Sequence, residues 1–374
     1  MNYASVWGQQ NMTLDTRRNQ AYYNALKQVI TPDSVVLDLG AGLGILGLLA
    51  AQLGAKKVYA VEPEATIEVA KDIARQNGYG ERFECLKGRI EKVNLPEQVD
   101  VIISVFTGNF LLEEDLLPSL FYARDKYLRP GGVMIPNAAR MEAVPVSAPN
   151  MYRDRIACWS EPHLGIDHNE ARKYASQAVY YTRAELAQAK YLAEPAELLT
   201  MDFYQCKSTN CDVKRSFYID QTELCHGWAG WFAMQLGDKW LSTAPHEPRL
   251  HWGSAFLPLD PPLQMQQGTE ARFKLQRPPK GDWSWSVSCD AGLQQHSTFF
   301  ALPLSLKSIK QMSPDYQPKL NQTGEAALYV LSHSNGNCSV SELSQKISHK
   351  YPKLFTEPTE ATNFVRGLMR QMSE

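Results

Sequence analysis

Residues 34–49 constrain the fold more than any other stretch of the chain. An apolar run ends in Asp38, and three alternating glycines follow before a helical apolar pattern begins: Gly40, Gly42 and Gly44. This order predicts a buried parallel strand, a tight turn and a helix start. Glycines in such a turn let the backbone approach a ligand where a Cβ atom would clash.

A second acidic residue narrows the class of ligand. Glu62 ends the next apolar run, residues 58–61. A carboxylate at this point can accept hydrogen bonds from both hydroxyls of a ribose. Glycine-rich loops alone occur in many nucleotide-binding proteins. The G-x-G-x-G spacing with Asp38 inside the strand end favours a nucleoside without a pyrophosphate, and therefore S-adenosylmethionine over NAD as the cofactor.

The alternation of strand and helix patterns predicts an α/β domain over residues 1–137. A helix is expected over 12–30, strands over 34–39, 57–62, 82–87, 99–105 and 131–136, and helices near 44–53, 65–77 and 114–128. This rhythm predicts a doubly wound, Rossmann-like parallel sheet with helices on both faces. In such sheets the ligand lies at the carboxyl ends of the strands.

The pattern changes after this domain. Short alternating runs separated by Pro, Gly or Asn predict an antiparallel β-barrel over residues 138–308, interrupted by a helix-leaning insert at 152–199. After a polar linker, residues 319–374 contain a capping box, Ser339 to Glu342, and predict a small helical or winged-helix domain.

Composition limits the partners and the compartment. The formal net charge of the 374 residues is −2, so no basic field indicates nucleic acid or an anionic membrane surface. No run of about 20 apolar residues predicts a membrane span, and the first residues do not form a signal peptide. The seven cysteines show no paired spacing. Cys206, Cys211 and Cys225, with His226, do not fit a zinc knuckle. We therefore expect free thiols, no metal and a cytoplasmic location.

Several spaced motifs then identify a resemblance. Asp38 to Gly44, the segment 88–91 (Gly-Arg-Ile-Glu), the segment 121–132 and His251-Trp252 together resemble protein arginine methyltransferases over roughly residues 3–290. Met12, Asp15, Arg18, Tyr22 and Asn24 fall at the spacing of that family's N-terminal helix, which covers the methyl donor. Leu250 stands where the family's Thr-His-Trp loop has its threonine.

The resemblance implies a role for each matching residue. The residues that would bind S-adenosylmethionine are Arg18, Asp38, Gly40, Gly42, Gly44, Glu62, Ile90 and Glu91. Arg18 would hold the donor's carboxylate, Ile90 would pack on the adenine, and Glu91 would accept from its amine. The catalytic residues would be Glu114, His251 and Asp15, and the last two would pair across the two domains. The residues on the acceptor side would be Tyr3, Met12, Val105 and Trp252.

One departure from the family concerns the acceptor. The family carries two glutamates in the loop after the fourth strand. Glu114 matches the second, but Val105 stands in place of the first. A guanidinium enters a site as a cation, and leaving one side of it unpaired costs about 3–5 kcal/mol. We therefore expect a peptide or small amine as the acceptor, and not ordinary protein arginine. Glu113 and Asp115 are interpreted as acids in the first turn of a helix.

Two further expectations concern partners. The segment 320–331 and the helix start at 339–343 resemble small winged-helix domains that bind leader peptides in peptide natural-product pathways. A leader peptide is therefore a possible partner of the tail. The insert at 152–199 occupies the place of the family's dimerisation arm, which implies a homodimer. Two alternatives stay open, namely a small-molecule N- or O-methyltransferase with a structural tail, and a donor-binding scaffold without catalysis.

Overall fold

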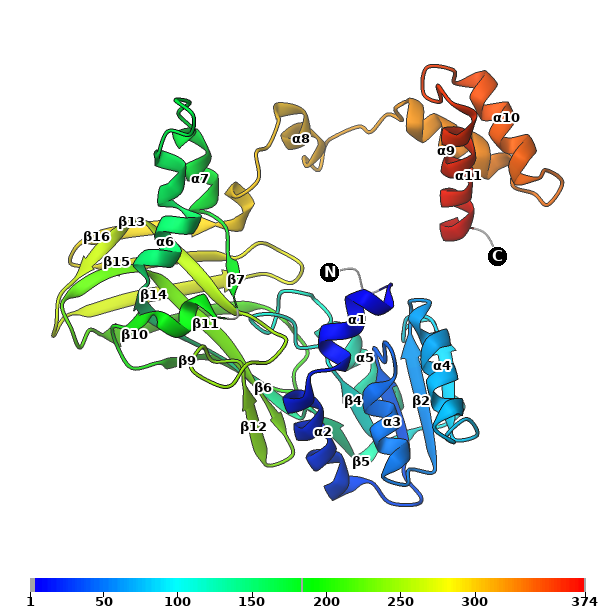
Figure 1. The fold of residues 1–374 in the computed structure, drawn as a ribbon, viewed down its shortest axis with the longest axis horizontal. Helices are drawn as coiled ribbons and strands as arrows, with labels where there is room; N and C mark the ends of the chain where they lie inside the picture. The colour runs from blue at the N-terminus through cyan, green and yellow to red at the C-terminus, as the bar shows by residue number, and fades with distance from the viewer. Residues whose placement is uncertain (1–3, 183, 373–374) are drawn as a thin grey trace. The chain divides into compact units, whose positions relative to one another are not determined.

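The computed structural model describes residues 4–182 and 184–372, and the chain divides into two compact units, residues 1–303 and 304–374. In the first unit, two helices precede a five-stranded sheet in the order β3-β2-β1-β4-β5, and all four strand pairs are parallel (Figure 1). The elements are α1 (Val6–Thr13), α2 (Thr16–Val29), β1 (Val35–Leu39), α3 (Ile45–Gln52), β2 (Lys57–Glu62), α4 (Thr66–Gln76), β3 (Phe83–Lys87), β4 (Val99–Ser104), α5 (Leu117–Tyr127) and β5 (Leu128–Ile135).

This arrangement confirms the predicted Rossmann-like sheet. The strand β1 is buried along its whole length, since it lies between β2 and β4 in the middle of the sheet. Two boundaries differ from expectation. The predicted helix over 12–30 is divided at Leu14–Asp15 into α1 and α2, and the helix expected from residue 114 begins only at Leu117.

The second part of this unit is antiparallel and barrel-like. One sheet has the order β7-β13-β11-β6-β8, with β12 paired to β11 and β9 to β6; the other has the order β10-β14-β15-β16. The strands are β6 (Ala138–Ser147), β7 (Tyr180–Thr182), β8 (Lys190–Tyr191), β9 (Ala196–Asp202), β10 (Cys211–Tyr218), β11 (Glu223–Leu236), β12 (Lys239–Ser242), β13 (Ser254–Met265), β14 (Glu270–Arg277), β15 (Ser284–Cys289) and β16 (Gly292–Ser297).

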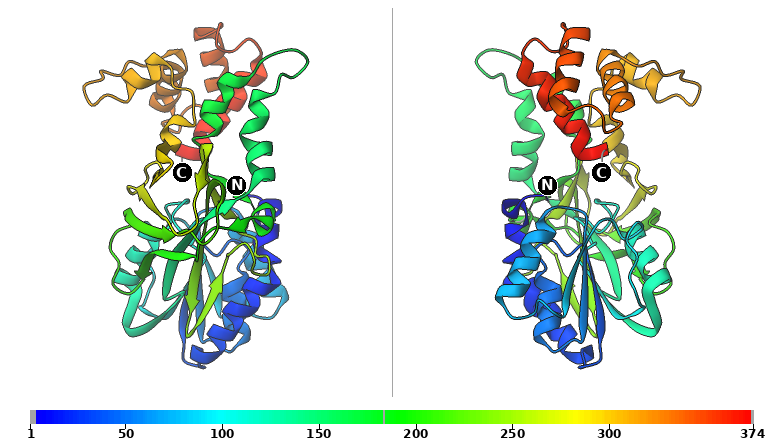
Figure 2. Two further views of the ribbon diagram at one scale, coloured as in Figure 1. Left: turned by 90° about the vertical axis from the view of Figure 1, so that its left-hand side faces the viewer. Right: turned by 90° about the vertical axis from the view of Figure 1, so that its right-hand side faces the viewer.

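The insert at 152–199 is less helical than expected. It starts within α6 (Pro149–Arg155), continues through short turns and α7 (Arg172–Ala175), and returns as strands β7, β8 and β9. The green helices α6 and α7 project from the barrel in Figures 1 and 2. A hydrogen-bond network fastens the base of this projection to β13. Arg172 pairs with Asp260 through both its Nε and a terminal nitrogen, at 2.9 and 2.6 Å, and the Tyr152 hydroxyl donates to Asp260 at 2.7 Å.

The second unit is helical. It contains α8 (Leu306–Gln311), α9 (Gln322–His333), α10 (Val340–Lys350) and α11 (Pro358–Met372), and the described residues 304–372 include no strand. Its core is a separate cluster that includes Val330, Ile347 and Val365. The predicted capping box opens α10, with Ser339 and Glu342 exchanging side chain to backbone hydrogen bonds. Of the two predicted forms of this domain, helical or winged-helix, the structure has the helical one, and the described residues lack the strands of a winged helix.

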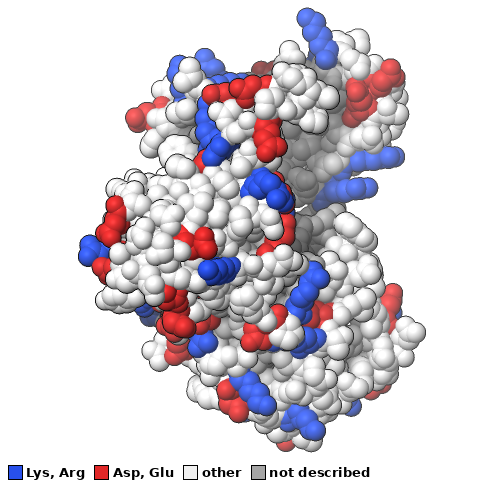
Figure 3. Space-filling view, turned by 60° about the vertical axis from the view of Figure 1, so that its left-hand side comes forward, with Lys and Arg blue, Asp and Glu red and all other residues white. Residues whose placement is uncertain are grey.

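Two surface features bear on partners. None of the helices in the described part of the chain has the length and apolar character needed to cross a lipid bilayer. On the face of the protein seen in Figure 3, acidic and basic side chains are interspersed.

Candidate active site

The carboxyl ends of β1 and β2 bring two buried carboxylates to one cavity. Asp38 and Glu62 are 2% and 6% exposed, and both line a cavity of about 400 Å³. Burial raises the pKa of Asp38 to about 7, although the Gly47 N–H donates to its Oδ2 at 2.8 Å. Burial also raises the pKa of Glu62, whose two oxygens accept from the N–H groups of Gly42 and Glu64 at 3.0 Å. Backbone donors therefore fix both carboxylates in place.

The glycine loop lets two side chains approach the backbone beside the cavity. Gly40 and Gly42 have positive φ angles of 72° and 55°. A Cβ atom at Gly40 would overlap the ring of Phe106, and one at Gly42 would lie 2.5 Å from Oε1 of Gln9. Both side chains therefore approach the loop only because these residues are glycine. Gly44 caps α3 and faces Phe83 instead of the cavity.

Arg18 brings a buried cation to the same cavity. Its side chain is 2% exposed, and burial lowers the pKa of the guanidinium. Its Nε and one terminal nitrogen donate to the amide oxygen of Asn19. Among the described residues, no carboxylate lies within ion-pair distance of this guanidinium. A buried cation facing a cavity without an ionic partner suits an anionic group of a ligand.

Asp15 and His251 meet beside this cavity, as the resemblance implied. Nδ1 of His251 lies 2.9 Å from Oδ2 of Asp15, which also accepts the His251 backbone N–H at 2.8 Å. Asp15 caps α2 by accepting from the Arg18 N–H at 3.0 Å. Burial raises the pKa of Asp15, but these hydrogen bonds lower it by more, so the net direction is downward. The pair connects the start of α2 with the loop before β13.

The loop between β4 and α5 places Glu114 in the cavity wall. Glu113 accepts from Tyr181 and from the Trp283 indole at 2.7 and 2.6 Å. Asp115 accepts from two nitrogens of Arg277 at 2.8 and 2.7 Å. The interpretation of Glu113 and Asp115 as first-turn acids of a helix is therefore wrong, since both bind the barrel and α5 begins after them. Glu114, between these two anchors, lines the cavity together with Val105.

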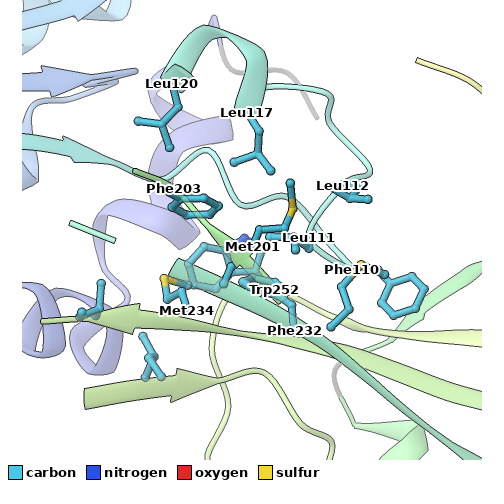
Figure 4. Packing of buried hydrophobic residues seen from close by; sticks show 14 of the residues in the cluster. Phe110, Leu111, Leu112, Leu117, Leu120, Met201, Phe203, Phe232, Met234 and Trp252 are labelled. Carbon is cyan, nitrogen blue, oxygen red and sulfur yellow. The ribbon is translucent and has the colours of Figure 1, made fainter. Parts of the chain in front are cut away.

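Apolar packing also holds the loop between β4 and α5 in place. Phe110, Leu111 and Leu112 are each at most 2% exposed. Figure 4 shows them beside barrel side chains that come from distant segments of the chain, including Phe203, Phe232 and Trp252. Phe110 and Leu111 have positive φ angles of 46° and 63°, which are strained for non-glycine residues. The barrel packing therefore holds the loop in this conformation.

The cavity wall contains some of the predicted site residues and lacks others. Those that line the cavity are Met12, Arg18, Asp38, Gly40, Glu62, Val105 and Glu114. Trp252 packs against Phe232 in the core, 5.4 Å between ring centroids. Ile90 and Glu91 are not among the residues that line the cavity. Ile90 is 2% exposed within the core, and Glu91 accepts from the Ser119 hydroxyl. Tyr3 lies outside the described residues.

Sequence reasoning missed several residues of the wall, Gln9 and Phe106 among them. Gln9 is 6% exposed in α1, a helix without a marked apolar face, so nothing in the local pattern distinguished it from Gln10. Phe106 directly follows Val105 in the loop after β4. This position was the one sequence feature that could have indicated that Phe106 lies at the site.

The fold and this cavity define an S-adenosylmethionine-dependent methyltransferase, and comparisons with known proteins agree. Residues 137–289 match the family model "Arginine methyltransferase oligomerization subdomain", and residues 20–136 match "Ribosomal protein L11 methyltransferase". Protein arginine N-methyltransferase 6 of Xenopus laevis is 32% identical over 281 residues, which cover 72% of this chain and 82% of the relative. The chain belongs to the protein arginine methyltransferase family.

Solved structures extend the comparison to the fold. A chain of the Trypanosoma brucei PRMT1 enzyme-prozyme heterotetrameric complex with AdoHcy aligns with a TM-score of 0.71 and 26% identity, over 79% of this chain and 99% of that chain. Arabidopsis thaliana protein arginine methyltransferase 10, described in an open conformation, aligns with a TM-score of 0.68 and the same identity and coverage.

Proposed function

We propose that this methyltransferase acts on a nitrogen of a peptide or small amine that carries at most one positive charge. The observation that carries the proposal is the composition of the cavity wall. At the acceptor end it presents Glu114 and Val105, where a two-carboxylate clamp would need a second acid. The relatives are named as protein arginine methyltransferases, so their names do not themselves support this restriction.

The donor end of the cavity fits S-adenosylmethionine. We assign the donor's carboxylate to Arg18, its ribose hydroxyls to Glu62, and its positively charged amino group to the vicinity of Asp38. The guanidinium of Arg18 without an ionic partner supports this assignment, because a bidentate carboxylate would satisfy it. When bound, S-adenosylmethionine supplies an electrophilic methyl group on a sulfonium sulfur.

At the acceptor end, Glu114 would accept a hydrogen bond from the acceptor nitrogen and then its proton, which keeps the nitrogen lone pair directed at the methyl group. The anchors on Glu113 and Asp115 hold this carboxylate at one place in the wall. The Asp15–His251 pair would keep α2, and with it Arg18, against the barrel.

Two partner proposals accompany this function. The insert at 152–199 would form a homodimer by packing on the donor domain of a second copy, which the match to an oligomerization subdomain supports. The helices of the second unit would bind a leader peptide of the substrate, as their resemblance to leader-peptide-binding domains implies.

The acceptor is tested by comparing two variants on two substrate classes. Glu114→Gln should reduce turnover on peptide or amine acceptors by about 10²–10⁴-fold, the range for loss of a positioned acid–base group, with donor affinity nearly unchanged. Val105→Glu should also reduce native activity, because a second carboxylate beside Glu114 raises one pKa of the pair. Asp238→Asn, at the exposed turn between β11 and β12, is the matched control.

Methyl transfer is measured from a radiolabelled donor, with products located by mass spectrometry. Robust methylation of arginine side chains in ordinary arginine-rich proteins by the unmodified chain would overturn the acceptor assignment. Equal turnover by Glu114→Gln and the parent would overturn the role of Glu114.

A further inference from the structure

A basic patch lies on the outer face of the second barrel sheet, away from the cavity described above. It consists of Lys214 on β10, Arg272 and Lys274 on β14, and Ser286 and Ser288 on β15, which line a hollow of about 220 Å³. On β14 and β15 the neighbouring side chains Phe273 and Val287 are at most 1% exposed, and on β10 Phe217, next to Ser216, is 2% exposed. The patch is therefore the solvent face of strands whose opposite face is core.

The register of the sheet concentrates positive charge in the patch. Lys214 is the direct cross-strand partner of Lys274, and Ser216, one step along the same face, is the partner of Arg272. Directly opposite side chains lie about 4.5–5.5 Å apart, and like charges at that distance destabilise a sheet. The pairing of Lys214 with Lys274 therefore lowers the stability of the sheet. An anion bound between the two ammonium groups would turn this repulsion into attraction.

Two carboxylates lie on the same face of these strands, Asp212 on β10 and Glu270 on β14, and one of them forms an ion pair with a cation of the patch. Glu270 pairs with Arg272 at 3.2 Å. In the described part of the protein, no carboxylate lies within ion-pair distance of Lys214 or Lys274. Next to these ammonium groups, Ser286 and Ser288 add hydroxyl donors on the adjacent strand. Ammonium, guanidinium and hydroxyl donors around one hollow are the chemistry that binds carboxylate or phosphate oxygens.

We infer that the basic patch binds an acidic segment of a peptide, with two or three carboxylates over Lys214, Arg272 and Lys274. The size of the patch favours a peptide over nucleic acid. Affinity for nucleic acid comes mainly from phosphate contacts made by an extended set of Lys and Arg side chains. Only a small group of cations lines this hollow, Lys214, Arg215, Arg272 and Lys274, and the chain has a net charge of −2. The inference does not rest on the proposed function, because binding here requires neither donor nor methyl transfer.

The test is fluorescence anisotropy of a fluorescein-labelled peptide, Gly-Glu-Glu-Gly-Glu-Glu-Gly, titrated with the full-length protein at low salt and at 0.5 M salt. The unmodified chain should bind the peptide, and high salt should weaken the binding, since exposed charge pairs are screened. The double variant Lys214→Glu/Lys274→Glu should weaken binding by at least about tenfold. Lys239→Glu/Lys310→Glu, with the same change of charge at exposed sites elsewhere, should bind like the parent.

A milder variant separates binding from folding. Lys274→Ser removes the cross-strand repulsion, so it should raise the melting temperature of the free protein while it weakens peptide binding. No binding of the peptide by the parent protein, or equal weakening by the control pair, would refute the inference. Tighter binding of a single-stranded oligonucleotide than of the peptide would refute the assignment to an acidic peptide.

Discussion

Replacement of Asp38 by asparagine tests how the donor end of the cavity is built. The Asp38 carboxyl is 2% exposed, and burial, with a smaller contribution from Glu62, raises its pKa to about 7. The hydrogen bond from Gly47 and the charge of Arg18 oppose this rise without cancelling it. Asp38→Asn keeps a carbonyl oxygen to accept from the Gly47 N–H, but it removes the titrating group.

The sign and the size of the effect follow from the two pKa values. The ordinary pKa of the group is 3.8, so between about pH 4 and pH 7 the folded chain binds more protons than the unfolded chain. The free energy of unfolding therefore falls as pH rises through this window, and above about pH 7 the full cost, about 4 kcal/mol, is present. The asparagine carries no such cost, but burying its amide N–H₂ group without a hydrogen-bond partner costs on the order of 1–3 kcal/mol at every pH.

Two measurements check the prediction. Thermal unfolding of the free protein should show Asp38→Asn gaining stability relative to the parent as pH rises from 5 to 8. Calorimetry at pH 8 should show weaker binding of S-adenosylmethionine, by about tenfold or more, because the substitution removes the carboxylate that we propose to face the donor's amino group. Asp33→Asn, at an exposed turn before β1, is the control and should change neither result.

A difference in stability between Asp38→Asn and the parent that stays constant from pH 5 to pH 8 would refute the reasoning about burial. Unchanged donor affinity would refute the assignment of Asp38 to the donor.

Three further predictions concern the donor site, the tail and the assembly. Glu62→Ala should weaken donor binding by at least about tenfold, measured by calorimetry with the demethylated product, and tight NAD binding instead would contradict the choice of cofactor. Deletion of residues 319–374 should raise the KM for a full-length precursor peptide while donor binding stays intact; unchanged kinetics would assign the tail to a structural role. Sedimentation at tens of micromolar should show a homodimer, whereas deletion of 157–178 from the insert should give a monomer.

Local sequence patterns determined the donor half of the fold. Apolar runs end in Asp38 and in Glu62, and glycines lie between strand and helix. The hydrophobic periodicity and the glycine positions both indicate a buried strand followed by a tight turn, so few other folds are compatible with this segment. The capping box at Ser339 is of the same kind, since its two hydrogen bonds lie within four residues. The class of protein followed from these local signals and their spacing.

Tertiary contacts decided the rest of the site. Nothing near Glu113 or Asp115 indicates that their partners are Trp283 and Arg277, more than 160 residues away. Because of those contacts and the packing of Phe110 and Leu111 against the barrel, α5 begins at Leu117 and Glu114 lies in the cavity wall. In the same way, the register that sets Lys214 opposite Lys274 is a property of the sheet. Local propensity fixes which elements form, whereas long-range packing and ion pairs fix which side chains meet.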